Sequence, residues 1–404
     1  MKKTLVLGLG KSGLASAEFL IKKGYRVVGI DIKFISTALP IEFHLEKNYS
    51  AEGPFAFAVI SPGVSPQHRI IVELKKRNIP IVGEVSLASQ FIRQPMIGIT
   101  GTNGKTSVTS IVTHVLNRCG IPAKAVGNIG SPLIECALQP TGEILVVELS
   151  SYQLETLARK CLDLGVILNI TPDHLDRYPG FLAYAKTKLH LQNCLKESAT
   201  LYLSKDSQKR FTSFVRHRNL VLFDAHTRLR ISGFIPSNLS AAFAICSHFS
   251  ISKNTFIDSL SFFETPKHRL EFVRELNQIH FYNDSKATNM DAVRMAVEVL
   301  DGKIWLLSGG ISKGQSFTSW SWQLKSCLQG IYAFGSCAKQ LFLELSSSIP
   351  VRLTETLKEA VLQAYLGARP GDIILLSPGC SSFDQFQNYE HRGDVFKKIV
   401  EELV

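Results

Sequence analysis

The segment from Met96 to Gly120 constrains the fold more than any other part of the chain. The apolar run MIGIT leads into a glycine-rich stretch, a helical pattern follows it, and Gly120 ends that pattern. Backbone N–H groups of such a loop bind phosphate oxygens, its lysine reaches the terminal phosphates, and the next hydroxyl can hold magnesium. The strict GxxxxGK[ST] pattern would need glycine at Ile99, so the loop is a variant. We predict that a nucleoside triphosphate binds to the loop residues, which are Gly101, Thr102, Asn103, Gly104, Lys105 and Thr106.

Strand and helix patterns alternate through the rest of the chain as well. Short apolar runs such as TLVLGLG, EILVVELS and DIILLSPG are separated by helical segments, which is typical of parallel sheets with helices on both faces. Proline-containing breaks stand at 93–95 and at 265–267. We therefore predict an α/β fold of three domains, each with a mostly parallel sheet flanked by helices. They are a Rossmann-like N-terminal domain (1–93), a central domain like a P-loop NTPase (94–266) and a Rossmann-like C-terminal domain (267–404).

Bulk composition narrows the class of protein. No apolar stretch approaches the roughly 18 residues of a membrane span, and the opening MKKTLVLGLGKSG is interpreted as a buried strand because glycines break its apolar run. The eight cysteines show no CxxC pair or zinc spacing, as expected in a reducing cytoplasm. The net charge of +11 suits nucleic acid or a polyanionic small substrate. Because the basic residues are spread along the chain, we favour the small substrate and expect no nucleic-acid partner.

A second glycine motif, GLGKSG, spans Gly8 to Gly13 between an apolar run and a helical pattern, and Asp31 ends the next apolar run. Glycines let backbone amides approach a diphosphate at a helix N-terminus, and an acidic residue about 20 positions later can bind a sugar or base hydroxyl. Taken alone, the motif predicts an NAD-dependent oxidoreductase, or simply a tight turn. Its strand–helix–strand setting favours diphosphate binding without identifying the nucleotide.

Two strand ends in the central domain carry candidate metal ligands. Glu148 ends the apolar run EILVVELS, and the loop after LGVILNI holds Asp173, His174 and Asp176. Such groups at the carboxyl ends of parallel strands, in a domain with a phosphate loop, suit a hard cation such as magnesium. The pattern is equally compatible with a surface acid at Glu148 and an ordinary polar histidine at His174.

Lys188 interrupts an apolar helical stripe. Phe181, Tyr184, Leu191 and Leu195 fall on the same stripe at spacings of three, four and seven. A lysine forced toward an apolar face should have a lowered pKa and hence more neutral, nucleophilic amine. Alternatively, its side chain extends along the helix so that the ammonium reaches water, and the pattern by itself favours this second arrangement.

Polar clusters in the C-terminal domain follow apolar runs. His268-Arg269 open the domain, the segment 284–289 lies between a strand and a helix, Lys313 follows two glycines, and 377–386 follows the last strong strand. The last three occupy strand-end loops, where doubly wound sheets bind ligands. Each could equally be a turn or a helix cap, and Thr288 and Asn289 are suitable N-caps.

Taken in order, these motifs resemble the Mur ligase family. The resemblance covers essentially the whole chain, and its most specific parts are VVELSSYQLE, NDSKATN and the terminal SPG with DQF. The full series is GITGTNGKT, GNIG, VVELSSYQLE, NITPDHLDRY, AKTKLHLQ, HRLE, NDSKATN, GGISKG and LLSPGCSSFDQF.

The resemblance implies a cytoplasmic, monomeric ATP-dependent ligase that joins a carboxylate to an amine. Its substrates would be UDP-N-acetylmuramoyl-L-alanine and D-glutamate, joined through an acyl phosphate in peptidoglycan precursor synthesis. The GLGKSG motif would then bind UDP rather than NAD. The residues implied for this nucleotide-linked substrate are Gly10, Ser12, Gly13, Asp31, Ser61 and Gly63, with Asn128 on the muramoyl side.

The resemblance also implies roles around ATP and two Mg²⁺ ions. Thr106 and Glu148 would bind one magnesium and His174 the second, while Lys188 would be carbamylated and would bridge the metals as an anion. Lys105, Glu148, His174 and Lys188 would form the catalytic set, and Asn238, His268 and Arg269 would contact ATP. The residues implied for D-glutamate are Lys286, Thr288, Lys313, Ser377 and Phe386.

The sequence is also compatible with three different functions. A Mur ligase for another amino acid, or a folylpolyglutamate synthase, shares the central domain; the GLGKSG unit and the terminal DQF favour D-glutamate. An NAD oxidoreductase accounts for Gly8 to Asp31 but leaves the phosphate loop, Gly101 to Thr106, without a role. A non-catalytic nucleotide switch accounts for the phosphate loop alone.

Overall fold

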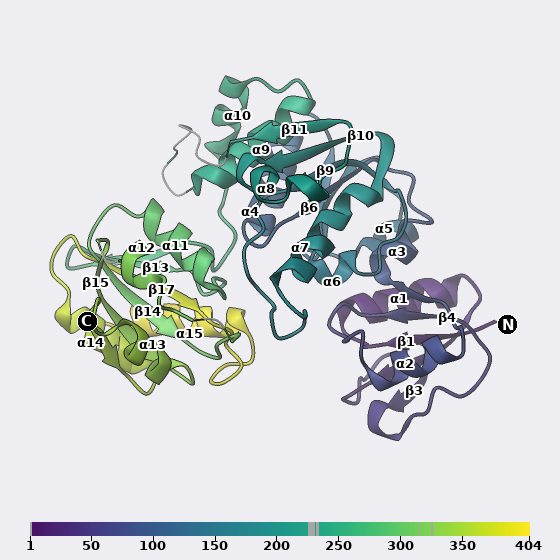
Figure 1. The fold of residues 1–404 in the computed structure, drawn as a ribbon, viewed down its shortest axis with the longest axis horizontal. Helices are drawn as coiled ribbons and strands as arrows, with labels where there is room; N and C mark the ends of the chain where they lie inside the picture. The colour runs from purple at the N-terminus through teal and green to yellow at the C-terminus, as the bar shows by residue number, and fades with distance from the viewer. Residues whose placement is uncertain (1, 225–230, 232–233, 315, 325) are drawn as a thin grey trace. The chain divides into compact units, whose positions relative to one another are not determined.

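The computed structural model describes residues 2–224, 231, 234–314, 316–324 and 326–404. It contains three sheets, each covered by helices and each mostly parallel, so the predicted three-domain α/β fold is confirmed (Figure 1). The predicted boundaries near 93 and 266 fall between β5 (Ile81–Gly83) and β6 (Met96–Thr100) and between β11 (Leu220–Phe223) and β12 (Glu271–Leu276). By internal packing the first two sheets form one compact unit, and the third forms another together with Thr171–Phe181.

The N-terminal sheet has five parallel strands in the order β3-β2-β1-β4-β5. Its central strand β1 reads KTLVL and is almost wholly buried, because both faces are covered. The remaining elements are β1 (Lys3–Leu7), α1 (Lys11–Lys22), β2 (Arg26–Asp31), β3 (Glu42–Leu45), η1 (Glu46–Asn48), β4 (Phe55–Ile60), α2 (Arg69–Lys76) and α3 (Glu84–Ala88).

The central sheet has six parallel strands in the order β11-β10-β9-β6-β8-β7, so the strand before the phosphate loop lies in the middle. That strand, β6, is buried at all five positions. The remaining elements are α4 (Lys105–Arg118), β7 (Ala123–Gly127), α5 (Leu133–Leu138), β8 (Ile144–Glu148), α6 (Ser151–Leu154), β9 (Leu162–Ile167), α7 (Phe181–Leu189), η2 (His190–Cys194), β10 (Leu195–Ser204), α8 (Lys205–Arg210), η3 (Thr212–Phe214), α9 (Pro236–His248) and α10 (Lys253–Leu260).

The C-terminal sheet has the order β12-β13-β17-β14-β15-β16, parallel except for the β12–β13 hairpin. Asn277 and Gln278 turn that hairpin with positive φ at both positions, as a two-residue hairpin turn of the primed type requires. The remaining elements are β13 (Ile279–Asn283), α11 (Met290–Val299), β14 (Ile304–Gly309), α12 (Trp320–Gln323), β15 (Leu328–Phe334), α13 (Ala338–Leu345), β16 (Val351–Leu353), α14 (Leu357–Gly367), β17 (Ile373–Gly379) and α15 (Tyr389–Glu401).

Two hydrophobic clusters sandwich the C-terminal sheet. Ile373 and Leu375 of β17 belong to one cluster, and Ile374 and Leu376 belong to the other. Alternate side chains of a strand point to opposite faces, so this run of four apolar residues serves both layers. The carboxyl ends of β13, β14 and β17 are thereby fixed side by side in the middle of the sheet.

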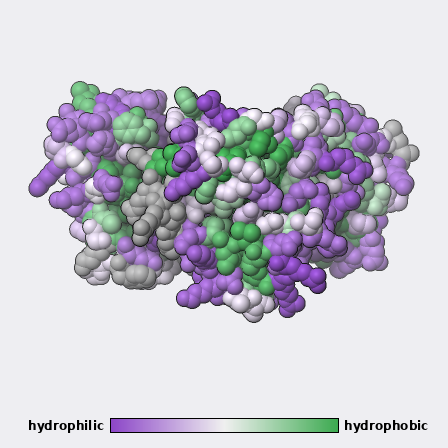
Figure 2. Space-filling model, turned by 90° about the horizontal axis from the view of Figure 1, so that it is seen from above, coloured by the Kyte–Doolittle hydropathy of each residue, from purple (hydrophilic) through white to green (hydrophobic). Residues whose placement is uncertain are grey.

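Hydrophilic residues cover much of the face seen in Figure 2, with hydrophobic residues in separate patches. Ile32 and Phe34, just after β2, are 76% and 74% exposed. Within the described part of the chain, no helix is both long enough and apolar enough to cross a membrane.

Candidate active site

The phosphate loop connects β6 to α4 and is braced from the neighbouring strand β9. The backbone N–H groups of Thr102 and Asn103 donate to the carbonyl and side-chain oxygens of Asn169, at 2.9 and 2.8 Å. The Asn169 amide donates back to the Asn103 carbonyl at 3.0 Å. Gly104 has φ +85, a conformation that favours glycine, and ends the loop where α4 begins. The loop shape is therefore fixed by the protein itself. The sequence motif did not point to Asn169, because its partner is 66 residues away.

Two lysines meet at the carbonyl of Gly101. Lys105 Nζ donates to the Gly101 and Thr102 carbonyls, both at 2.9 Å, and Lys188 Nζ donates to Gly101 at 2.8 Å. Lys188 is only 1% exposed, and its Nζ lies 4.8 Å from the Tyr184 ring centre. The expectation that its ammonium reaches water was therefore wrong. The apolar stripe of α7 packs against the phosphate loop, so the amine is held inside the protein.

Glu148 ends β8 beside the loop, since β6 and β8 are neighbours and Ile99 pairs with Glu148. Its side chain is 2% exposed, and Oε1 accepts a hydrogen bond from Asn128 at 2.8 Å. Oε2 is buried without a hydrogen-bond partner among the described residues. A surface acid is thus excluded. A buried carboxylate oxygen with no donor fits a cation ligand, as does the Thr106 hydroxyl in the first turn of α4.

His174 belongs to the segment Thr171–Phe181, which packs with the C-terminal sheet. It has φ +54, and its backbone N–H donates to the Asp173 carboxylate at 2.9 Å. Asp173 also accepts from Lys313 at 2.8 Å and from Asn289 at 3.1 Å. Burial opposes ionisation of Asp173, but Lys313 and His174 outweigh it and keep the pKa of this carboxyl below its usual value. Among the described residues no three His, Cys, Asp or Glu side chains gather as a metal cluster.

Asp31 and Ser61, two of the residues predicted to bind the nucleotide-linked substrate, hold the N-terminal glycine loop in place. Asp31 Oδ2 accepts from the Leu9 N–H at 2.7 Å, and the Ser61 hydroxyl donates to the Gly8 carbonyl at 2.7 Å. A Cβ on Gly13 would lie 1.9 Å from the Gly8 oxygen, so only glycine fits there. Asp31 and Ser61 therefore shape the loop, and their contact with a ligand stays a prediction.

The mouth of that loop is open. In the part of the chain that the structure describes, no side chain caps the first N–H groups of α1, and a Cβ at Gly10 or Gly63 would meet no atom within 4 Å. Ser12 lies partly exposed in the first turn of α1. Uncapped N–H groups at a helix N-terminus bind anions. Lys11 donates to the Gly130 carbonyl in the GNIG turn, where Asn128 follows β7, so this turn connects the N-terminal glycine loop to Glu148.

In the C-terminal domain, Asp284 and Ser377 face each other inside the protein. The Ser377 hydroxyl donates to Asp284 Oδ2 at 2.9 Å, and neither side chain is more than 4% exposed. Burial raises the pKa of Asp284 to about 7, although Arg269 and Ser377 oppose the shift. Ser377 thus holds an internal carboxyl group, and its contact with a ligand stays a prediction.

The other residues predicted to bind the amino acid lie beyond the carboxyl ends of β13, β14 and β17. Lys286 lies over the Tyr389 ring at 5.2 Å, and Lys313 pairs with Asp173. Thr288 is partly buried before α11, which Asn289 caps by accepting from the Ala292 N–H at 2.9 Å, so the expected cap is confirmed at Asn289. The segment 377–386 ends at Phe386, which packs against the Leu376 side of the core.

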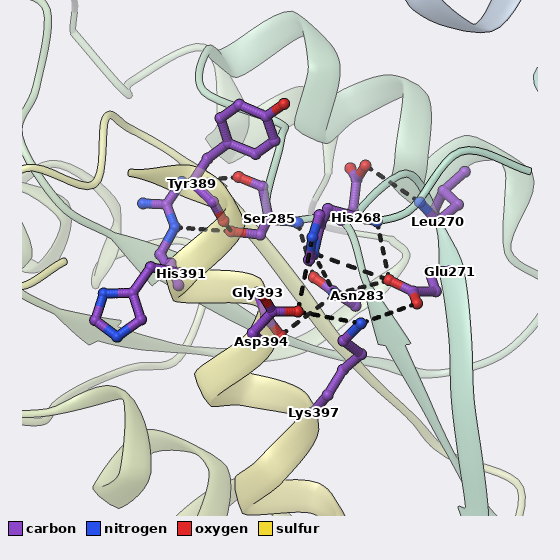
Figure 3. A network of polar contacts seen from close by, with 12 residues as sticks. His268, Leu270, Glu271, Asn283, Ser285, Tyr389, His391, Gly393, Asp394 and Lys397 are labelled. Atoms are coloured by element: carbon purple, nitrogen blue, oxygen red, sulfur yellow. Dashed lines mark hydrogen bonds and ion pairs between the residues drawn. The ribbon is translucent and has the colours of Figure 1, made fainter. Parts of the chain in front are cut away.

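Figure 3 shows the polar network around His268. The ring Nδ1 lies 3.0 Å from the Asn283 amide, and the His268 N–H donates to Glu271 at 2.9 Å. Burial lowers the pKa of His268, and a Cβ on Gly393 would lie 2.2 Å from its ring. The His268 ring is therefore enclosed within the domain, while the Nε of its neighbour Arg269 is buried with no hydrogen-bond partner in the described ranges. Their predicted contacts with ATP are not tested by this geometry.

Asn238, the remaining predicted ATP contact, is 3% exposed in the first turn of α9. In the first unit, the phosphate loop lies beside two lysine amines and a buried carboxylate. These groups suit phosphoryl transfer from a bound nucleotide.

The three domains match known domain families in order. Residues 2–83 match the MurD-like N-terminal domain of Mur ligases, residues 99–257 the Mur ligase middle domain, and residues 268–380 the Mur ligase glutamate ligase domain. The fold and the site define an ATP-dependent ligase that forms amide bonds. The chain belongs to the Mur ligase family.

Relatives match over their full lengths. UDP-N-acetylmuramoylalanine–D-glutamate ligase of Protochlamydia amoebophila is 38% identical, covering 100% of this chain and 98% of that protein. The enzyme of the same name from Chlamydia felis is 36% identical with the same coverage. Among solved structures, the MurF ligase of Thermotoga maritima in complex with ADP has a TM-score of 0.64 at 16% identity, covering 99% of this chain and 95% of that one. The structural likeness shows the fold alone.

Proposed function

We propose that this chain catalyses the ATP-dependent addition of D-glutamate to UDP-N-acetylmuramoyl-L-alanine in peptidoglycan precursor synthesis. The observation that carries this proposal is the similarity, 38% over the whole chain, to a ligase named for that reaction. The phosphate loop, the anion site at α1 and the lysines at the C-terminal strand ends supply a separate place for each substrate. We also propose that the protein carries out this reaction in the cytoplasm and as a monomer.

ATP is the nucleotide that we assign to the loop 101–106. Backbone N–H groups at the start of α4 and the Lys105 ammonium neutralise phosphate oxygens. Lys105 already lies against the loop carbonyls, so a short movement of its end brings Nζ to the terminal phosphates. Asn238, His268 and Arg269 are proposed contacts of the same nucleotide.

Two magnesium ions are proposed to stabilise charge on the transferred phosphoryl group. Thr106 and Glu148 are the proposed ligands of one, and the orphaned Oε2 of Glu148 supports this assignment. His174 is the proposed ligand of the second. Lys188 is proposed as a carbamate, formed when its neutral amine attacks CO₂ and releases a proton. Burial of the amine supports this, because burial disfavours the charged ammonium.

UDP is proposed to occupy the anion site at α1. The diphosphate would accept from the open N–H groups there, around Gly10, Ser12 and Gly13, with Asp31, Ser61 and Gly63 nearby. Asn128 is proposed to face the muramoyl side. The match of residues 2–83 to the MurD-like N-terminal domain favours UDP over the dinucleotide that the glycine motif alone suggests.

D-glutamate is proposed to bind at the strand ends of the C-terminal domain, with Lys286, Thr288 and Lys313 attracting its carboxylates. Ser377 and Phe386 belong to the same proposed site. Lys313 is paired with Asp173 here, so an incoming carboxylate must compete with that aspartate for it.

The proposed reaction has two steps. The alanyl carboxylate oxygen attacks the γ-phosphorus of ATP, ADP leaves, and an acyl phosphate forms. The amine of D-glutamate then attacks the acyl carbon, loses a proton and expels phosphate, which leaves an amide. No protein nucleophile is needed, so positioning and charge stabilisation supply the rate enhancement.

Phosphate release from ATP with UDP-N-acetylmuramoyl-L-alanine tests the proposal across a panel of D- and L-amino acids. We expect release with D-glutamate and little with any different amino acid. A preference for another amino acid would reassign the chain within its family. Release with a folate substrate would indicate a folylpolyglutamate synthase, and an NADH-dependent absorbance change would indicate an oxidoreductase.

A further inference from the structure

Arg392 is a charged residue at the centre of the C-terminal domain. It lies in the first turn of α15 and is 0% exposed, on the same stripe as Phe396, Ile399 and Val400. Burial lowers the pKa of its guanidinium to about 10, so the group is still charged at neutral pH. Among the described residues no carboxylate forms an ion pair with it, and Asp384 attracts it only from a longer distance.

The guanidinium instead joins three loops. Nε and Nη2 donate to the hydroxyl and carbonyl oxygens of Ser285, at 3.0 and 2.8 Å. Nη1 donates to the Cys380 carbonyl at 3.1 Å and to the Gly309 carbonyl at 3.4 Å. These three residues stand at or just beyond the carboxyl ends of β13, β17 and β14, the three adjacent strands in the middle of the sheet.

Further hydrogen bonds join these loops to one another and to the start of α15. The Ser285 hydroxyl donates to the Tyr389 carbonyl at 2.8 Å, and Figure 3 shows these two residues side by side. Ile311 and Ser381 exchange backbone hydrogen bonds at 2.9 and 3.1 Å, which joins the loop after β14 to the loop after β17. The Arg392 side chain thus bonds to the ends of all three strands or the loops that follow them.

Burying a cation without a counter-ion costs stability, and an apolar side chain of similar volume would often serve the core as well or better. The placement therefore indicates a role beyond packing. The loops carry the proposed amino-acid ligands: Lys286 and Thr288 follow Ser285, Lys313 follows Gly309, and Ser377 and Phe386 flank Cys380.

We propose that Arg392 is a positioning residue for the incoming amino acid: its planar guanidinium sets the spacing of the three strand-end loops that hold D-glutamate. The inference rests on the proposed function. Arginine is suited to this because its donors point in fixed directions in one plane, whereas a lysine ammonium is a single point of charge.

The test compares Arg392→Lys with Arg274→Lys in steady-state phosphate release. Arg274 is a matched control, because it also donates to two backbone carbonyls of the end of α15, Val400 and Glu401, both at 3.1 Å, and these lie outside the three loops. For Arg392→Lys we expect KM for D-glutamate to rise about 10- to 100-fold, as for a misplaced binding group. KM for ATP and for the nucleotide-linked substrate should stay within about twofold of wild type.

Chemical rescue separates positioning from folding. Added guanidinium at low millimolar concentration should recover part of the D-glutamate KM of Arg392→Ala, and ammonium at the same concentration should not. Neither ion should affect Arg274→Ala. Equal changes in all three KM values, with no rescue, would mean that Arg392 only supports the fold and would overturn the inference.

If the Arg392 variants do not fold, Ser285→Ala tests the inference instead. It removes the hydroxyl that accepts from Arg392 Nε and keeps the Ser285 carbonyl that accepts from Nη2. A selective but smaller rise in KM for D-glutamate supports the inference, and an unchanged KM overturns it. The proposed function has its own test: it fails if the wild-type protein releases no phosphate with D-glutamate. In that case the KM values of the Arg392 and Arg274 variants are compared for the amino acid that the protein does use.

Discussion

The side-chain amine of Lys188 lies 2.8 Å from the carbonyl oxygen of Gly101, inside the protein and at the mouth of the phosphate loop. The neighbouring amine of Lys105 donates to the same carbonyl at 2.9 Å. Two lysine amines thus share one acceptor, although only Lys105 belongs to the phosphate-loop motif. Burial disfavours the charged ammonium, and a neutral amine is the form that can react with CO₂, which supports the proposal that Lys188 is a carbamate.

Replacing Lys188 by alanine should reduce phosphate release by at least about 100-fold, since it removes a charged group from a site built on charge stabilisation. Small carboxylic acids, formate or acetate, should restore part of the rate by taking the place of a carbamate. Lys186→Ala is the control, because Lys186 is exposed two residues earlier on the same helix and lies over Phe214. Absence of rescue, together with no carbamate carbon in labelled-bicarbonate NMR, would remove the carbamate proposal.

Replacing Lys105 by alanine should abolish turnover, because it removes the ammonium that we propose to neutralise the terminal phosphates. Binding of the UDP-linked substrate should be nearly unchanged, since the anion site at α1 is a separate structure. Calorimetry measures that affinity, with Lys196→Ala, a half-exposed lysine of the same sheet, as control. An equal loss of nucleotide-linked substrate binding would contradict the assignment of the two substrates to separate loops.

Asn169→Ala should weaken ATP binding, because the phosphate loop loses the side chain that holds it in shape. The side chain of Asn169 holds Asn103 through two hydrogen bonds, at 2.8 and 3.0 Å. Their loss should cost about 1–3 kcal/mol of unfolding free energy and raise KM for ATP by about 10-fold. Thermal unfolding and steady-state kinetics measure the two effects. Asn193→Ala, whose amide pairs with the ring of His190 at the surface, should change neither.

The stability of the protein should depend on pH through Asp284. Its pKa is about 7 in the folded state against an ordinary value of 3.8, so the folded protein holds one more proton between these values. The stabilisation from the neutral acid is fully present below pH about 3.8 and is lost as the pH rises through about 7. Asp284→Asn keeps a neutral group and should raise Tm relative to wild type at pH 8.5, with a smaller difference at pH 5.

The exposed Asp301→Asn is the control for that experiment. It should leave the pH dependence of Tm as in wild type. A difference between Asp284→Asn and wild type that stays constant from pH 5 to pH 8.5 would show that the Asp284 carboxyl does not titrate in this range.

Local patterns sufficed for the elements and for the loops between them. Gly101 to Gly104 stand between a strand of five buried residues and the helix that begins at Lys105, and the loop follows from that order alone. The alternation of strands and helices predicted three mostly parallel sheets, and of the two predicted caps, Thr288 and Asn289, it is Asn289 that caps α11. These features depend on residues within one or two turns of each other, so the sequence carries them directly.

Tertiary packing decided which polar side chains are enclosed and what they hold. The sequence alone favoured a Lys188 amine that reaches water. In the structure its helix α7 lies against the phosphate loop, and the amine is enclosed there. Arg392 sits on a similar stripe in α15, yet nothing nearby in sequence shows that Ser285, Gly309 and Cys380 surround it. Ser377 and Asp284 are 93 residues apart and meet because their strands are neighbours. The sequence contains the groups that can bond, but the order of strands in the sheet determines which of them are brought within reach.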